Sequence, residues 1–152
     1  MSKPLISELF PMTLYFVDNE DEYKRVMKKS GGYEFAGKDE KYNEFPVDGS
    51  AITIATDGEN GLEIVVAIGE QETDERAISI IIHESVHVWQ FTKNAIREKH
   101  PGIETEAYAT QYYATWMIAQ YKQREAARKA KAEKNKQLED VLDVLKEMKP
   151  NK

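Results

Sequence analysis

Residues 78–89 read ISIIIHESVHVW, and the organisation of the chain follows from this segment. Its apolar residues recur at helical spacing, which predicts a helix with one side in the core. At about 100° per residue, His83 and His87 lie on one face a single turn apart, and Glu84 lies roughly 100° round from His83. Two imidazoles placed in this way can reach one Zn²⁺, so the segment predicts a metal site on a core helix.

The predicted helix has a polar side and an apolar side. The polar side carries Arg76, His83, His87, Gln90 and Asn94, and the apolar side carries Ile78, Ile81, Ile82, Ser85, Val88 and Trp89. Histidines on an otherwise apolar helix are typical of a buried metal site rather than of a solvated helix face. The alternative is an accidental HExxH in a structural helix, for which metal removal would change nothing.

A catalytic zinc ion takes three protein ligands and keeps one position for water. The chain has no cysteine, so the third ligand must be a histidine or a carboxylate. Glu84 is placed to act as the general base that takes a proton from the metal-activated water. Glu104 and Glu106 compete for the third position because they lie on opposite sides of the next predicted helix, and His100 is a further alternative.

The segment before the motif helix predicts strands. Residues 12–17 form an aromatic and β-branched strand, followed by a short helix capped by Asn19 or Asp18. A further short strand is expected at residues 33–35, within a stretch that is otherwise mostly loop. Turn-forming Asp-Gly and Asn-Gly pairs between residues 51–55 and 62–68 predict a hairpin. The sequence therefore favours an α+β fold with a short, mostly antiparallel sheet.

Two long helices are predicted after the hairpin. Thr73 is the expected N-cap of the motif helix, which should end near Glu98 because Pro101 cannot continue it. A second helix should begin near Ile103 and run beyond Tyr121. These helices would carry His83, His87, Glu104 and Glu106, and His100 would lie in the connection between them.

Composition limits the classes of partner. The 152 residues carry a net charge of −6, which argues against a nucleic-acid partner. No apolar run reaches the ~18–20 residues of a membrane span, so we expect a soluble, cytoplasmic protein without a membrane partner. Residues 1–121 should form the metal-binding domain, and residues 122–152 a charged helical extension whose apolar positions could dock on a partner or a second copy.

HExxH followed closely by PGIETEAY, residues 101–108, resembles the gluzincin metallopeptidases. The resemblance implies a small zincin-like domain in which a sheet packs on the HExxH helix and a second helix carries a glutamate ligand. It implies that Glu104 is the third zinc ligand. The family usually has aspartate at the position of Tyr108, so the residue that supports a zinc-binding histidine stays open between Tyr108 and Gln111.

The resemblance also implies where substrate binds. In zincins a strand before the motif helix lies along the cleft and pairs with an extended peptide, and the matching segment here is 62–68. Leu62, Ile64 and Val66 are then the substrate-binding residues. Tyr108 is the candidate donor to the oxyanion, with Tyr112 and Tyr113 as alternatives.

These features predict a zinc metallopeptidase that cleaves a peptide or protein substrate. The alternative is a zincin-like protein that binds zinc but acts as a non-catalytic binding or regulatory module. Compact chains with this motif pair look like proteins of bacteria and bacteriophages.

Overall fold

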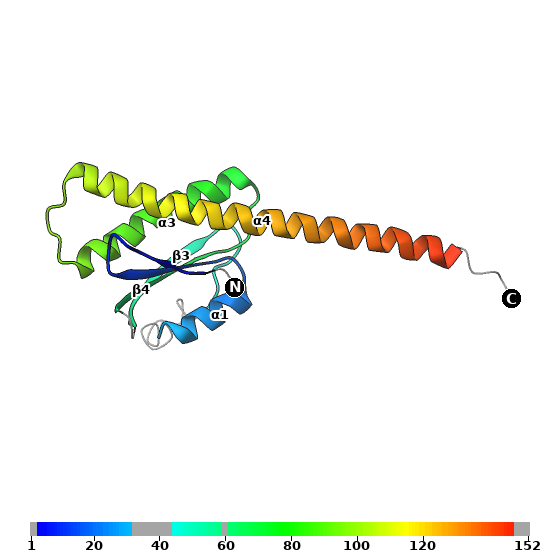
Figure 1. The fold of residues 1–152 in the computed structure, drawn as a ribbon, viewed down its shortest axis with the longest axis horizontal. Helices are drawn as coiled ribbons and strands as arrows, with labels where there is room; N and C mark the ends of the chain where they lie inside the picture. Colours follow the sequence, from blue (N-terminus) through cyan, green and yellow to red (C-terminus); the bar gives the residue numbers. More distant parts are fainter. Residues whose placement is uncertain (1–2, 32–43, 59–60, 148–152) are drawn as a thin grey trace. The chain divides into compact units, whose positions relative to one another are not determined.

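The computed structural model describes residues 3–31, 44–58 and 61–147, so the short strand expected at residues 33–35 lies outside the described part. The chain divides into two compact units, Met1–Ile118 and Ala119–Lys152. Within the described ranges, no helix is long and apolar enough to cross a membrane. The elements are β1 (Leu5–Ile6), β2 (Met12–Val17), α1 (Glu20–Lys29), β3 (Ala51–Gly58), β4 (Gly61–Ile68), α3 (Asp74–Ala95) and α4 (Ile103–Glu147) (Figure 1).

The four strands form one sheet in the order β1-β2-β4-β3. Antiparallel pairing joins β1 to β2 and β3 to β4, whereas β2 runs parallel to β4 at the centre. A parallel pair needs a crossover connection, and here the chain passes through α1 and β3 between the two strands. The α+β class is confirmed, and the sheet is mixed: two of its three strand pairings are antiparallel, and the central one is parallel.

Local signals place the helix ends. The Asn19 side chain accepts a hydrogen bond from the Glu22 N–H at 2.9 Å, and Thr73 accepts one from the Arg76 N–H at 3.1 Å, so both predicted caps are confirmed. The motif helix ends at Ala95, before the expected Glu98. The chain turns there because Arg97 adopts a positive φ of 58°, a left-handed conformation that commonly closes a helix.

The sheet lies between two helical layers. Figure 1 shows α1 on one face, with α3 and the first turns of α4 on the other. Alternate strand residues point to opposite faces, so each layer has its own core. The α1 side contains Tyr15, Val17, Tyr23, Val26, Met27, Ile54, Val65 and Ala67. The buried residues that alternate with these on the strands, towards α3, are Met12, Leu14, Phe16, Ile64, Val66 and Ile68.

The unit Ala119–Lys152 contains the second part of α4. Its residues from 126 to 143 are exposed, and short ion pairs along the helix join Arg128 to Glu125 and Lys146 to Asp143. Such exposed pairs stabilise a helix only weakly. Of the apolar positions expected to dock on a partner, the described Leu138, Val141 and Leu142 are exposed.

An aromatic cluster joins α3 to the first turns of α4. The Phe10 ring lies 5.5 Å from the Trp89 ring and 6.4 Å from the Tyr113 ring, measured between centroids. The Tyr113 hydroxyl is buried without a hydrogen-bond partner among the described residues. The nearby Thr92 hydroxyl donates to the Val88 carbonyl at 2.8 Å. Burial raises the pKa of Tyr113 to about 12, against a smaller opposing effect of Thr92.

Tyr113→Phe should therefore preserve or increase stability at neutral pH, because it removes an unsatisfied buried hydroxyl. The raised pKa of Tyr113 favours the neutral form in the folded state. The resulting contribution to the free energy of unfolding is complete below pH ~10 and is lost as the pH rises towards ~12. Urea unfolding at pH 8 and pH 11 checks this. The wild type should lose about 1.4 kcal/mol more than Tyr113→Phe between these values, because pH 11 lies one unit above the unfolded-state pKa and one unit below the folded-state pKa of about 12; equal losses would contradict the assignment.

Candidate metal centre

The packing of α3 on β3 and β4 determines which of its residues face outward. Its buried residues are Ala77, Ile81, Glu84, Ser85, Val88, Trp89 and Thr92. His83 is exposed and His87 is half-buried, so the predicted two-sided helix is largely confirmed. Two details differ: Ile82, expected in the core, is 48% exposed, and the histidine side is open to solvent rather than buried.

The two histidines converge on one point. Their Nε2 atoms lie 3.2 Å apart, and the rings meet edge to face with centroids 4.9 Å apart. Two nitrogens bound tetrahedrally to one Zn²⁺ at their usual distances would be separated by about 3.4 Å. The spacing of the pair therefore fits two neighbouring coordination positions of a single ion.

Gln90 supports the second histidine, a role that the sequence analysis did not assign. Its side-chain Oε1 lies 3.0 Å from Nδ1 of His87. With Oε1 as acceptor, Nδ1 carries the proton and the lone pair of Nε2 faces the other imidazole. The three-residue spacing on the polar side of the helix was the available signal, because residues i and i+3 are neighbours on a helix surface.

Glu84 is buried where α3 packs on the sheet. It is only 7% exposed, and its Oε2 accepts a hydrogen bond from the Thr53 hydroxyl on β3 at 2.5 Å. This short distance is typical of an O–H donor to an ionised carboxylate. The bond joins residues far apart in the sequence, so no local pattern could have identified Thr53.

The strand expected to receive substrate is an interior strand. β4 pairs with β2 on one side and with β3 on the other, so its backbone is not available to an added peptide. Ile64 and Val66 are fully buried, whereas the half-buried Leu62 lines a surface pocket beside Phe91. Among the described strands, the edge next to α3 is β3.

The two competing glutamates lie on opposite sides of α4, as predicted. Glu104 shares the exposed side with Tyr108, which is 67% exposed. Glu106 shares the inner side with the buried Ala109 and Tyr113. The side of α4 that faces α3 is therefore that of Glu106.

Glu106 is engaged by α3 rather than by the histidines. Its Oε1 accepts hydrogen bonds from Trp89 Nε1 and from Lys93 Nζ, each at 3.2 Å. These two donors, Trp89 first, lower the pKa of the Glu106 carboxyl. This carboxylate attaches the start of α4 to α3.

The other expected site residues are dispersed. Tyr108 and Gln111 are exposed on the outer side of α4. His100 is exposed in the connection between α3 and α4, where its N–H donates to Glu98 Oε1 at 3.0 Å. Tyr112 packs its ring against Tyr113, 5.5 Å between centroids.

The donor set thus fits a zinc ion in part. The histidine pair has suitable spacing and a supporting hydrogen bond. Over residues 3–31, 44–58 and 61–147, however, no three His, Cys, Asp or Glu side chains gather into a group that could hold a metal ion. The two histidines lie together, and Glu104 does not join them in such a group.

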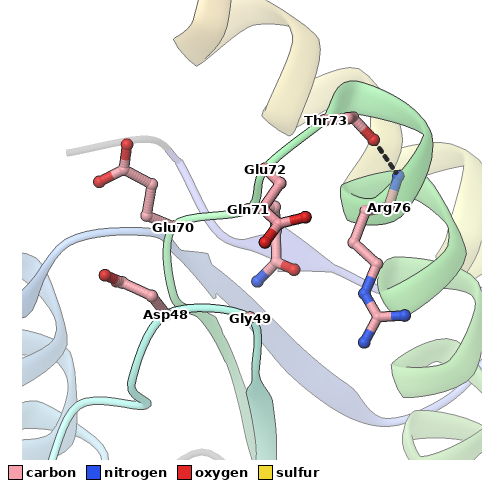
Figure 2. A pocket seen from close by; sticks show the side chains of 7 residues that line it. All are labelled: Asp48, Gly49, Glu70, Gln71, Glu72, Thr73 and Arg76. Carbon is pink, nitrogen blue, oxygen red and sulfur yellow. Dashed lines mark hydrogen bonds between the residues drawn. The ribbon is translucent and has the colours of Figure 1, made fainter.

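A separate pocket of about 650 Å³ lies at the start of α3. Figure 2 shows Thr73 capping the Arg76 N–H while the guanidinium extends along the helix, with the carboxylates of Asp48, Glu70 and Glu72 on the other walls. Acidic side chains beside a helix N-terminus do not by themselves define a ligand. We assign this pocket no role in the centre.

The chain matches no protein-family model, no curated protein and no solved structure.

The two glutamates should differ in their effect on acid stability. The lowered pKa of Glu106 contributes stability that is present above pH ~4.5 and is lost as the pH falls through the folded-state value. Glu106→Gln should therefore be less stable than the wild type at pH 7 and should lose less stability on acidification. Urea unfolding at pH 7 and pH 3 measures this, with the exposed Glu104→Gln as matched control; an equal effect of both substitutions would refute the assignment.

Proposed function

We propose that this chain is a zinc-dependent hydrolase, and more narrowly a metallopeptidase of the gluzincin kind. The observation that carries the proposal is the convergence of the His83 and His87 Nε2 atoms on the helix that also buries Glu84. An accidental HExxH has no need of converging imidazoles, of a supporting Gln90 or of a held carboxylate.

In this proposal His83 and His87 would hold Zn²⁺ through Nε2, and Gln90 would orient the second ring. The bound ion supplies Lewis acidity, which polarises a scissile carbonyl and makes water acidic near neutral pH. Glu84 is the general base: it takes a proton from the attacking water and passes it to the leaving amine. Tyr108, the expected oxyanion donor, is exposed on α4 and stays a proposal.

The third ligand is proposed to be Glu104. It is exposed in the first turn of α4, whereas Glu106 is bonded to Trp89 and Lys93. The first turn of a helix lacks part of its backbone hydrogen bonding, so it moves at lower cost than the helix interior. Glu104 would reach the histidines by movement of that turn.

The substrate is proposed to be an extended peptide that pairs with β3. This strand is the edge of the described sheet next to α3, and its Thr53 contacts the proposed base. Backbone pairing along an edge strand gives affinity for peptides, and side-chain pockets give preference. Pairing of the peptide with β3 takes the place of the pairing with residues 62–68 that the sequence led us to expect.

The second candidate is a zinc-binding protein without turnover that acts as a binding or regulatory module. The absence of a third acidic or imidazole side chain beside the pair, over the described residues, favours it. It predicts zinc binding without peptide cleavage.

The deciding experiment measures zinc stoichiometry and peptide hydrolysis together. We expect near-stoichiometric zinc in the wild type, loss of zinc in His83→Ala, and retention in Glu84→Gln with hydrolysis reduced by several orders of magnitude. Glu104→Ala should lose zinc while the matched Glu106→Ala keeps it. Zinc retention without hydrolysis of any peptide in a library supports the second candidate, and a wild type that takes up no zinc refutes both.

Gln90 provides a graded test of the same centre. Gln90→Leu removes the hydrogen-bond acceptor for His87 Nδ1 and leaves both imidazoles in place. Loss of such a supporting group typically costs about 10–100-fold in metal affinity. Competition with a chromophoric chelator measures the change, with Asn94→Leu, one turn further along the exposed side, as control; equal affinities for both variants would contradict the role of Gln90.

A further inference from the structure

We infer that Thr53 is the positioning residue for Glu84 and couples it to the edge of the sheet where a peptide would bind. The effect of Thr53 on catalysis rests on the proposed function, whereas the hydrogen bond between Thr53 and Glu84 does not. Thr53 lies on β3 and Glu84 on α3, so their hydrogen bond links the helix of the histidines to the edge strand.

The hydrogen bond between Thr53 and Glu84 is suited to orienting the carboxylate. The hydroxyl-to-Oε2 distance is 2.5 Å, and Glu84 is 7% exposed, so solvent competes little with the bond. A carboxylate has two oxygens, and a donor on one of them sets the plane in which the other lies. Thr53 therefore removes rotational freedom that Glu84 would otherwise retain.

The register of the hairpin shows which way the Thr53 backbone points. Residue pairs along β3 and β4 alternate between hydrogen-bonded and non-hydrogen-bonded. The Gly69 N–H donates to the Ser50 carbonyl at 3.0 Å, which makes Ser50 and Gly69 a hydrogen-bonded pair. Counting along the register, Thr53 and Val66 form a non-hydrogen-bonded pair, so the N–H and C=O of Thr53 face away from β4.

The same residue thus offers its backbone to an added strand and its side chain to Glu84. A peptide paired with β3 would hold the Thr53 backbone in place, and the hydroxyl would transmit that restraint to the carboxylate. Because the bond joins two elements, substrate docking and orientation of the base become one event. This places the coupling in a residue outside the HExxH motif.

The chain offers matched variants for a test. Thr53→Val removes the hydroxyl and keeps the side-chain shape, while Thr53→Ser keeps the hydroxyl. Thr56→Val is the control, because Thr56 lies on the same strand but donates to the Ser30 carbonyl at 2.7 Å on the other face of the sheet. It loses a buried hydrogen bond without touching Glu84.

The first measurement is a double-mutant cycle in urea on the metal-free protein. Thr53→Val should lower the folding equilibrium constant by about tenfold or more, since the lost bond is to a charged group. The loss should largely disappear in a Glu84→Met background. Thr56→Val should lower stability equally in both backgrounds. Additive effects of Thr53→Val and Glu84→Met would overturn the inference.

The second measurement is hydrolysis of a peptide by the zinc-loaded protein. Thr53→Val should lower kcat by about 10–100-fold with little change in KM, because the base is misplaced after substrate binds. Thr53→Ser should restore kcat, and Thr56→Val should leave it unchanged. Equal kcat values for Thr53→Val and Thr56→Val would overturn the coupling to catalysis.

The two hypotheses fail in different ways. If the wild type cleaves no peptide, the proposed hydrolase is refuted, yet the double-mutant cycle in urea still decides whether Thr53 holds Glu84. If the wild type cleaves peptides but the double-mutant cycle is additive, the proposed hydrolase stands and the role of Thr53 in positioning Glu84 is refuted.

Discussion

The rotation of α3 about its own axis is the constraint on which the centre depends. The helix buries one side against β3 and β4, and that burial fixes every other direction on its surface. His83 then faces solvent, while Glu84, a quarter turn away, enters the contact with β3. The core packing of the motif helix thus leaves His83 in solvent and His87 half-buried, and it places the carboxylate of Glu84 in the contact with the sheet.

Local signals in the sequence predicted most elements because each depends on neighbouring residues. The caps at Asn19 and Thr73, the hairpin and the two sides of α4 require only short-range hydrogen bonds or helical periodicity. The histidine pair belongs to the same class, since the spacing along one helix already brings the imidazoles together. Gln90 lies within that range too.

Features that depend on distant segments were not predictable in this way. The order of the sheet places β4 inside because β2, from the start of the chain, pairs with its far side. Periodicity separated Glu104 from Glu106 but could not say which side of α4 would meet α3. Thr53 carries no signal at all, because a threonine in a strand is ordinary until the helix packs against it.

The separation in the sequence between contacting residues affects the order in which these contacts form during folding. The β3–β4 hairpin and the histidine pair close only short loops, whereas the parallel pairing of β2 with β4 must wait for a long loop to close. A single turn of α3 is enough to bring the two imidazoles together. The Thr53–Glu84 bond, in contrast, forms only when α3 has packed against the hairpin, so it belongs to a later stage of folding than the histidine pair.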